Sequence, residues 1–160
     1  MNNNAILLQL QCALELGYPE MIAIFKLSGC DMNQATLQLL LKTEEEDEFI
    51  PCSNPLMSFF LDGLIVHKRG RLASADGPAP KPDASLDNNA ILKKLRIALD
   101  LKEEDMLAIM KLAGVIVSKS ELSAMFRTKG NKHYKECGDQ FLQSFLQGLT
   151  LRCQVTAEAE

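Results

Sequence analysis

The sequence predicts an all-α protein made of two homologous four-helix units, and three observations carry this prediction. Residues 88–155 repeat residues 3–70 at a constant offset of 85 positions, with 22 identities and no gap. The apolar side chains are mostly Leu, Ile, Met and Ala, which favour helices. A segment rich in Pro and small residues, 70–86, separates the repeats and is typical of a flexible tether. Because one such unit buries only a small core, we expect the two to pack on each other with pseudo-two-fold symmetry.

The repeat divides the chain into four segments. Residues 1–69 and 87–155 are the helical repeats, 70–86 is the flexible linker, and 156–160 is a short disordered tail.

The first two helices of each repeat follow from an apolar stripe and from helix-end signals. The first helix is expected over about Asn4–Leu16 and Asn89–Leu101, preceded by cap residues at 2–4 and 87–89. The second begins near Pro19 in one repeat and near Lys102 in the other. Glycines at 29 and 114 are expected to end it.

The third and fourth helices carry the clearest local signals. Asn33 and Ser118 are predicted to cap the third helix. In the second repeat its core face is expected to contain Leu122, Met125 and Phe126. Asn54 and Asp139 are predicted to cap the fourth. Each fourth helix contains Phe-Leu-x-Gly-Leu, with the glycine at 63 or 148. Glycine inside a helix costs about 1 kcal/mol relative to alanine, so its presence in both copies predicts a closely crossing helix.

These motifs resemble the YehS-like family of bacterial proteins. The resemblance rests on Asn88–Ala98, on Glu136–Leu149 and on Phe60–Gly70, and it covers both repeats. It implies an intracellular bacterial protein built from two copies of a small helical domain. It implies no activity, cofactor or catalytic residue.

The composition sets limits on the class of protein. No apolar run is long enough for a membrane span, and the N-terminus lacks the pattern of a signal peptide. We therefore expect a cytoplasmic protein without a membrane partner.

Its five cysteines are an odd number, which favours reduced thiols. No nucleotide, metal or cofactor motif is present, so no cofactor is predicted.

Cys52 and Cys137 are the two cysteines at equivalent positions, and each precedes the fourth helix. A thiol there could be reactive, because a helix N-terminus lowers a cysteine pKa. The favoured interpretation is a small buried residue at a loop-to-helix junction. His133 lies four residues before Cys137, but Glu48 at the matching position argues against a Cys-His pair. The spacing predicts no zinc site.

The charge differs between the repeats: residues 1–70 have a net charge of −5, and residues 86–160 have +1. The second repeat has a candidate anion-binding or nucleic-acid-binding face, formed by Lys93, Lys94, Arg96, Arg127, Lys129, Lys132 and Lys135. Two other interpretations stay open. These cations can form an ordinary solvated face, or they can face the acidic loop Glu44–Glu48 of the first repeat.

Three functional hypotheses follow. The sequence favours a non-enzymatic cytoplasmic module that binds a protein or regulates one, because no acid, base and nucleophile converge in it. The alternative is a DNA- or RNA-binding regulator that uses the basic face, against which the overall charge of −4 argues. The third is a thiol-dependent enzyme. A homo-oligomer is left open.

Overall fold

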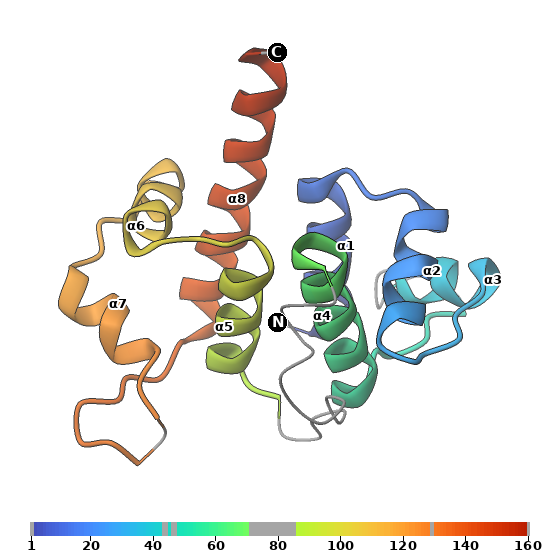
Figure 1. Cartoon of the computed structure of the whole chain (residues 1–160), viewed down its shortest axis with the longest axis horizontal. Coiled ribbons are helices and arrows are strands. Elements are labelled where there is room, and N and C mark those ends of the chain that lie inside the picture. Colours follow the sequence, from blue (N-terminus) through green and yellow to red (C-terminus); the bar gives the residue numbers. More distant parts are fainter. Residues whose placement is uncertain (1, 43–44, 46–47, 71–85, 129, 160) are drawn as a thin grey trace. The chain divides into compact units, whose positions relative to one another are not determined.

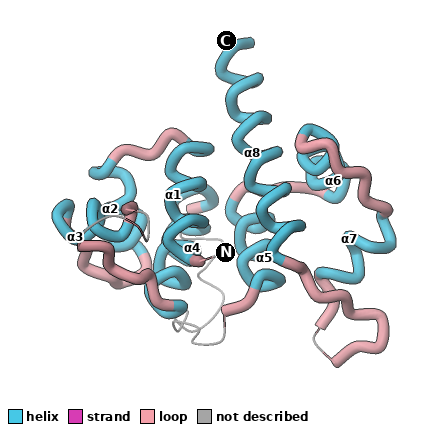
Figure 2. The backbone as a smooth tube through the Cα atoms, turned by 180° about the vertical axis from the view of Figure 1, so that it is seen from behind, coloured by secondary structure: helices cyan, strands magenta, loops and turns pink. Residues whose placement is uncertain are grey.

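The computed structural model describes residues 2–42, 45, 48–70, 86–128 and 130–159 (Figure 1). These residues form α-helices joined by loops and no strand, so the all-α prediction is confirmed (Figure 2). The chain divides into two compact units, Met1–Leu86 (unit 1) and Asp87–Glu160 (unit 2). Most of the predicted linker, 71–85, lies outside the described residues. The pseudo-two-fold packing stays a prediction.

Each unit has four helices within its described residues, in the same order. Unit 1 contains α1 (Asn3–Leu14), α2 (Tyr18–Leu27), α3 (Gln34–Leu40) and α4 (Asn54–Arg69). Unit 2 contains α5 (Asn88–Ala98), α6 (Glu103–Leu112), α7 (Lys119–Met125) and α8 (Asp139–Ala159).

Side-chain caps start the first and third helices of both units, as predicted. The side chains of Asn2 and Asp87 accept hydrogen bonds from backbone N–H groups in the first turns of α1 and α5. Asn33 and Ser118 do the same for α3 and α7. Each bond satisfies one N–H group that has no partner inside its helix.

The starts of α4 and α8 differ from the prediction. Ser53, and not Asn54, caps α4 by accepting a hydrogen bond from the N–H of Leu56. Asp139 is the first residue of α8, and the carbonyl of Gly138 accepts the hydrogen bond from Leu142. The predicted caps were wrong because the side chains at 54 and 139 accept from other helices, as described below.

The first helices end before the predicted boundary. Glu15 and Asp100 have φ values of 52° and 51°, so the chain leaves the helix at equivalent points. Leu16 and Leu101 are buried beyond that turn, which explains why periodicity included them in the helix. Gly29 and Gly114 follow α2 and α6 with φ values of 92° and 81°, so their predicted role at helix ends is confirmed.

Helix α8 continues to Ala159, through residues 156–159 that the sequence assigned to a disordered tail. In unit 1 the helix stops at Gly70, whose φ is 82°. Unit 2 has Val155 at the equivalent position and good helix formers after it, which removes the stop signal.

The core of each unit forms where the fourth helix packs on the second. Helix α4 packs mainly on α2, and α8 mainly on α6. A Cβ atom built on Gly63 would lie 1.9 Å from the carbonyl oxygen of Ile24. On Gly148 it would lie 2.0 Å from the carbonyl oxygen of Ile109. The predicted close crossing is therefore present in both units, and only glycine permits it.

We expect Gly148→Ala to lower the free energy of unfolding of unit 2 by about 3 kcal/mol, because backbone must move to admit the methyl group. Urea denaturation followed by circular dichroism measures this loss. The control is Gly138→Ser, at a position with no atom within 4 Å of a built Cβ atom. Equal stability of the two variants would contradict the crossing geometry.

Candidate functional site

One asparagine in each unit holds the loop before the fourth helix. The amide nitrogen of Asn89 donates to the carbonyl oxygens of Met125 (3.0 Å) and Lys135 (2.9 Å). Its oxygen accepts from the N–H of Cys137 at 2.8 Å. The side chain is 8% exposed. Because the three partners lie at the end of α7 and along the loop, this amide fixes the loop that carries Lys135.

Asn4 makes the same three bonds in unit 1. Its amide nitrogen donates to the carbonyls of Leu40 and Ile50, and its oxygen accepts from the N–H of Cys52. We call each such set of three bonds an asparagine clamp.

The preceding asparagine joins the first helix to the start of the fourth. Asn3 donates to the carbonyl of Cys52 and to the side-chain oxygen of Asn54. Asn88 donates to the carbonyl of Cys137 and, at 2.7 Å, to Asp139. This bond from Asn88 lowers the pKa of the Asp139 carboxyl below its ordinary value.

The two equivalent cysteines are buried. Burial raises the pKa of each thiol from 9.0 to about 12, with neighbouring Asp139 adding to the effect at Cys137. At neutral pH the ionised fraction of such a thiol is about a thousandfold smaller than that of an ordinary cysteine. These properties argue for a structural role at both positions.

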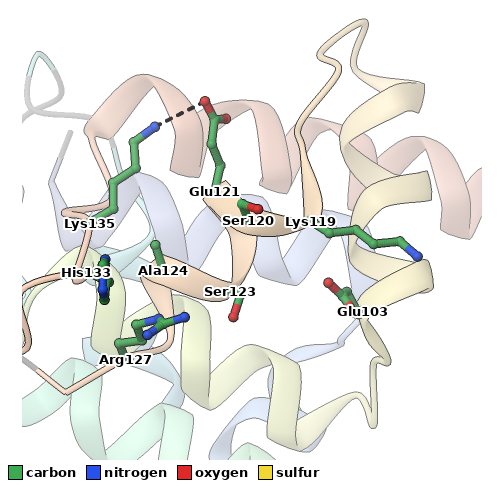
Figure 3. Close-up of a pocket in the computed structure, with 9 residues that line it drawn as sticks. All are labelled: Glu103, Lys119, Ser120, Glu121, Ser123, Ala124, Arg127, His133 and Lys135. Atoms are coloured by element: carbon green, nitrogen blue, oxygen red, sulfur yellow. Dashed lines mark ion pairs between the residues drawn. The ribbon is translucent and has the colours of Figure 1, made fainter.

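An open groove of about 660 Å³ runs along α7 in unit 2 (Figure 3). Figure 3 shows Lys135 and Glu121 at one end of the groove and Lys119 and Glu103 at the other. The groove is lined by Glu103, Lys119, Ser120, Glu121, Ser123, Ala124, Arg127, His133 and Lys135.

Two smaller depressions adjoin the groove. One of about 240 Å³ shares Arg127 with it and is also lined by Lys93, Phe126 and Tyr134. Another of about 150 Å³ shares Ser123 with the groove and is lined by Arg96 and Phe126 as well. Each of the three is lined in part by residues of α7, and we call them together the α7 surface.

Three contacts involve the charged side chains of the α7 surface. The guanidinium carbon of Arg96 lies 4.6 Å from the centroid of the Phe126 ring, and its Nε donates to the carbonyl of Leu101. Lys135 and Glu121 form an ion pair at 3.5 Å, with both side chains about half exposed. Arg96 is therefore held in place, whereas the Lys135–Glu121 pair is of a kind that contributes only 0–1 kcal/mol or so.

The structure brings together four of the seven predicted cations: Lys93, Arg96, Arg127 and Lys135 line the α7 surface. Lys94 is partly buried on α5 and Lys132 is exposed in the loop, and neither lines any of the three depressions. Lys129 lies outside the described residues.

Unit 1 lacks this charge pattern. At the positions equivalent to Lys93, Arg96 and Lys135 it has Leu8, Gln11 and Ile50. Its cation at the equivalent of Arg127 is Lys42. The cations at positions 93, 96 and 135 are therefore specific to unit 2.

Sequence reasoning missed three parts of the surface. It assigned Phe126 to the core face of its helix, but the ring is only partly buried and lies against Arg96. It passed over Lys119 and Ser123, which line the groove. Lys119 and Ser123 stand where unit 1 has Gln34 and Gln38, and this difference between the repeats is a signal that points to them.

The described residues show neither a metal-binding cluster nor a membrane span. No group of three His, Cys, Asp or Glu side chains among them is placed to hold a metal ion. None of their helices has the length and apolar character needed to cross a bilayer.

Comparison with known proteins supports the duplicated architecture. A family model described as "Protein of unknown function (DUF1456)" matches residues 3–70 and again residues 88–154. The chain belongs to this family. It is 39% identical over 155 residues to "Uncharacterized protein YehS" of Escherichia coli (strain K12), covering 97% of this chain and 98% of that protein. No solved structure matches.

We expect Cys52 and Cys137 to resist alkylation in the folded protein at pH 7.5, because their raised pKa values keep the thiols protonated. The exposed Cys12 is the internal control. Iodoacetamide labelling followed by peptide mass spectrometry measures each rate. Labelling of Cys52 or Cys137 as fast as Cys12 would restore the thiol-enzyme hypothesis.

We expect Asn89→Asp to destabilise unit 2 by roughly 3 kcal/mol, because a carboxylate cannot donate to the carbonyls of Met125 and Lys135. Asn131→Asp is the matched control: Asn131 uses its oxygen to accept from the N–H of His133, and Asp keeps that acceptor. Chemical denaturation compares the two. Similar stabilities would show that the asparagine clamp contributes little.

Proposed function

We propose that this protein is a non-enzymatic binding module that recognises a partner protein through the α7 surface of unit 2. The observation that carries the proposal is the mixed-charge surface around α7, whose cations Lys93, Arg96 and Lys135 are replaced by uncharged residues at the equivalent positions of unit 1. The two units share one fold and differ in this surface, which favours unit 2 as the unit that binds the partner.

The chemistry of the surface supports binding rather than catalysis. Its described side chains are cations, carboxylates, two serines, Ala124 and His133, spread along an open groove. Neither Cys52 nor Cys137 lines any of the three depressions. A nucleophile paired with a base and an orienting group, as covalent catalysis requires, is not part of this lining.

Nucleic acid is the second candidate partner, favoured by Lys93, Arg96 and Arg127 beside the Phe126 ring. Glu103, Glu121 and Asp87 line the same depressions and would repel phosphates. A protein segment can match both signs of charge, which is why we favour a protein partner.

We expect a photo-crosslinking amino acid at position 123 to capture a partner protein in cells that make this protein, because Ser123 is exposed in the groove. Gln38, exposed at the equivalent position of unit 1, is the matched control. Mass spectrometry identifies the captured protein. Capture of the same set of proteins from both positions, or of none from position 123, contradicts the proposal.

A further inference from the structure

We propose that the α7 surface binds an acidic peptide segment of the partner protein, with the carboxylates of that segment on Lys93, Arg127 and Lys135. This inference rests on the proposed function and adds the chemistry of the partner.

The three cations line two hollows that share Arg127. Lys135 lines the groove, Lys93 lines the 240 Å³ depression, and Arg127 lines both. All three side chains are exposed. A segment that passes from one hollow to the other therefore crosses Arg127, whose planar guanidinium suits two-point binding of a carboxylate.

The acidic side chain beside Lys135 does not block this site. The Lys135–Glu121 pair spans 3.5 Å between side chains that are 47% and 51% exposed. Exposed pairs of this kind are weak, so an incoming carboxylate can replace Glu121 at Lys135. The backbone of Lys135 stays fixed, because Asn89 holds its carbonyl and its N–H donates to the carbonyl of Ala124.

Arg96 has a different part in recognition. Its guanidinium is stacked on Phe126 and its Nε is bonded to Leu101. Phe126 is partly exposed and lines both smaller depressions. The ring offers an apolar contact between cations, so the segment that fits best alternates acidic residues with an apolar one.

Backbone hydrogen-bond donors, rather than the sign of the charge, distinguish this segment from a nucleic acid. Asp87, Glu103 and Glu121 line the surface together with the cations. A phosphate backbone carries one sign of charge and meets these carboxylates unfavourably. A peptide offers backbone N–H groups to them and carboxylates to the cations.

The test measures binding of the full chain to a fluorescein-labelled peptide that repeats Glu-Ala-Glu-Leu, by fluorescence anisotropy at about 0.15 M salt, where the Debye length is about 8 Å. Its twin has Gln in place of Glu. We expect the twin to bind at least tenfold or so more weakly, and Arg127→Glu to weaken binding of the Glu peptide by about tenfold. Lys93→Glu is a second variant with the same expected direction. Thermal unfolding checks that each variant is folded.

Lys132→Glu is the control for general attraction. Lys132 is exposed in the same loop and lines none of the depressions, and the substitution changes the net charge by the same amount as Arg127→Glu. We expect it to change the affinity by less than about threefold, because solvent screens charges that do not touch the ligand.

Three outcomes overturn the inference: equal losses for Lys132→Glu and Arg127→Glu, equal binding of the Gln twin, or tighter binding of a single-stranded oligonucleotide that depends on Arg127. If the peptide fails while crosslinking at position 123 still captures a protein, the acidic segment is wrong and the proposed function stands. Failure of the crosslinking experiment removes both.

Discussion

The asparagine clamp is the constraint on which the rest of each unit depends. A long loop must leave the third helix, cross the end of the first and enter the fourth, and it carries backbone groups that have no helical partner. In unit 2 the Asn89 amide satisfies three of them, at Met125, Lys135 and Cys137. Leaving even one buried group unsatisfied would cost about 1–3 kcal/mol. The clamp therefore fixes the loop, and with it the point where the fourth helix starts.

Units 1 and 2 share several buried residues but differ in surface charge. Both units use an equivalent asparagine, a buried cysteine and a helical glycine, yet their surfaces around the third helix differ in charge. Since the clamp bonds to backbone atoms, it places no demand on the side chains of the loop. Lys135 in unit 2 and Ile50 in unit 1 have carbonyls held in the same way. This separation lets one unit carry a charged surface while its core stays unchanged.

Local signals in the sequence predicted the helices and the glycine crossings well, because caps, proline and glycine act within a few residues. The role of Asn4 and Asn89 was missed, since asparagine near a helix start is an ordinary cap residue. Their real partners lie 36 to 48 positions along the chain. Phe126 was assigned to the core for a similar reason: helical periodicity shows which residues share a face, but not what covers it. The α7 surface likewise depends on residues from three helices and a loop, which only the tertiary fold brings together.

The close crossing at Gly63 and Gly148 also restricts insertions within α4 and α8. About two thirds of the aligned positions have changed since the duplication. A one-residue insertion within α4 would turn the helix by about 100°. A residue with a side chain would then face the carbonyl of Ile24 in place of Gly63. Substitutions away from the crossing leave that contact intact. The residue types could therefore change far more freely than the number of residues in the helix. Comparison of the two repeats therefore shows which sequence changes this fold tolerates.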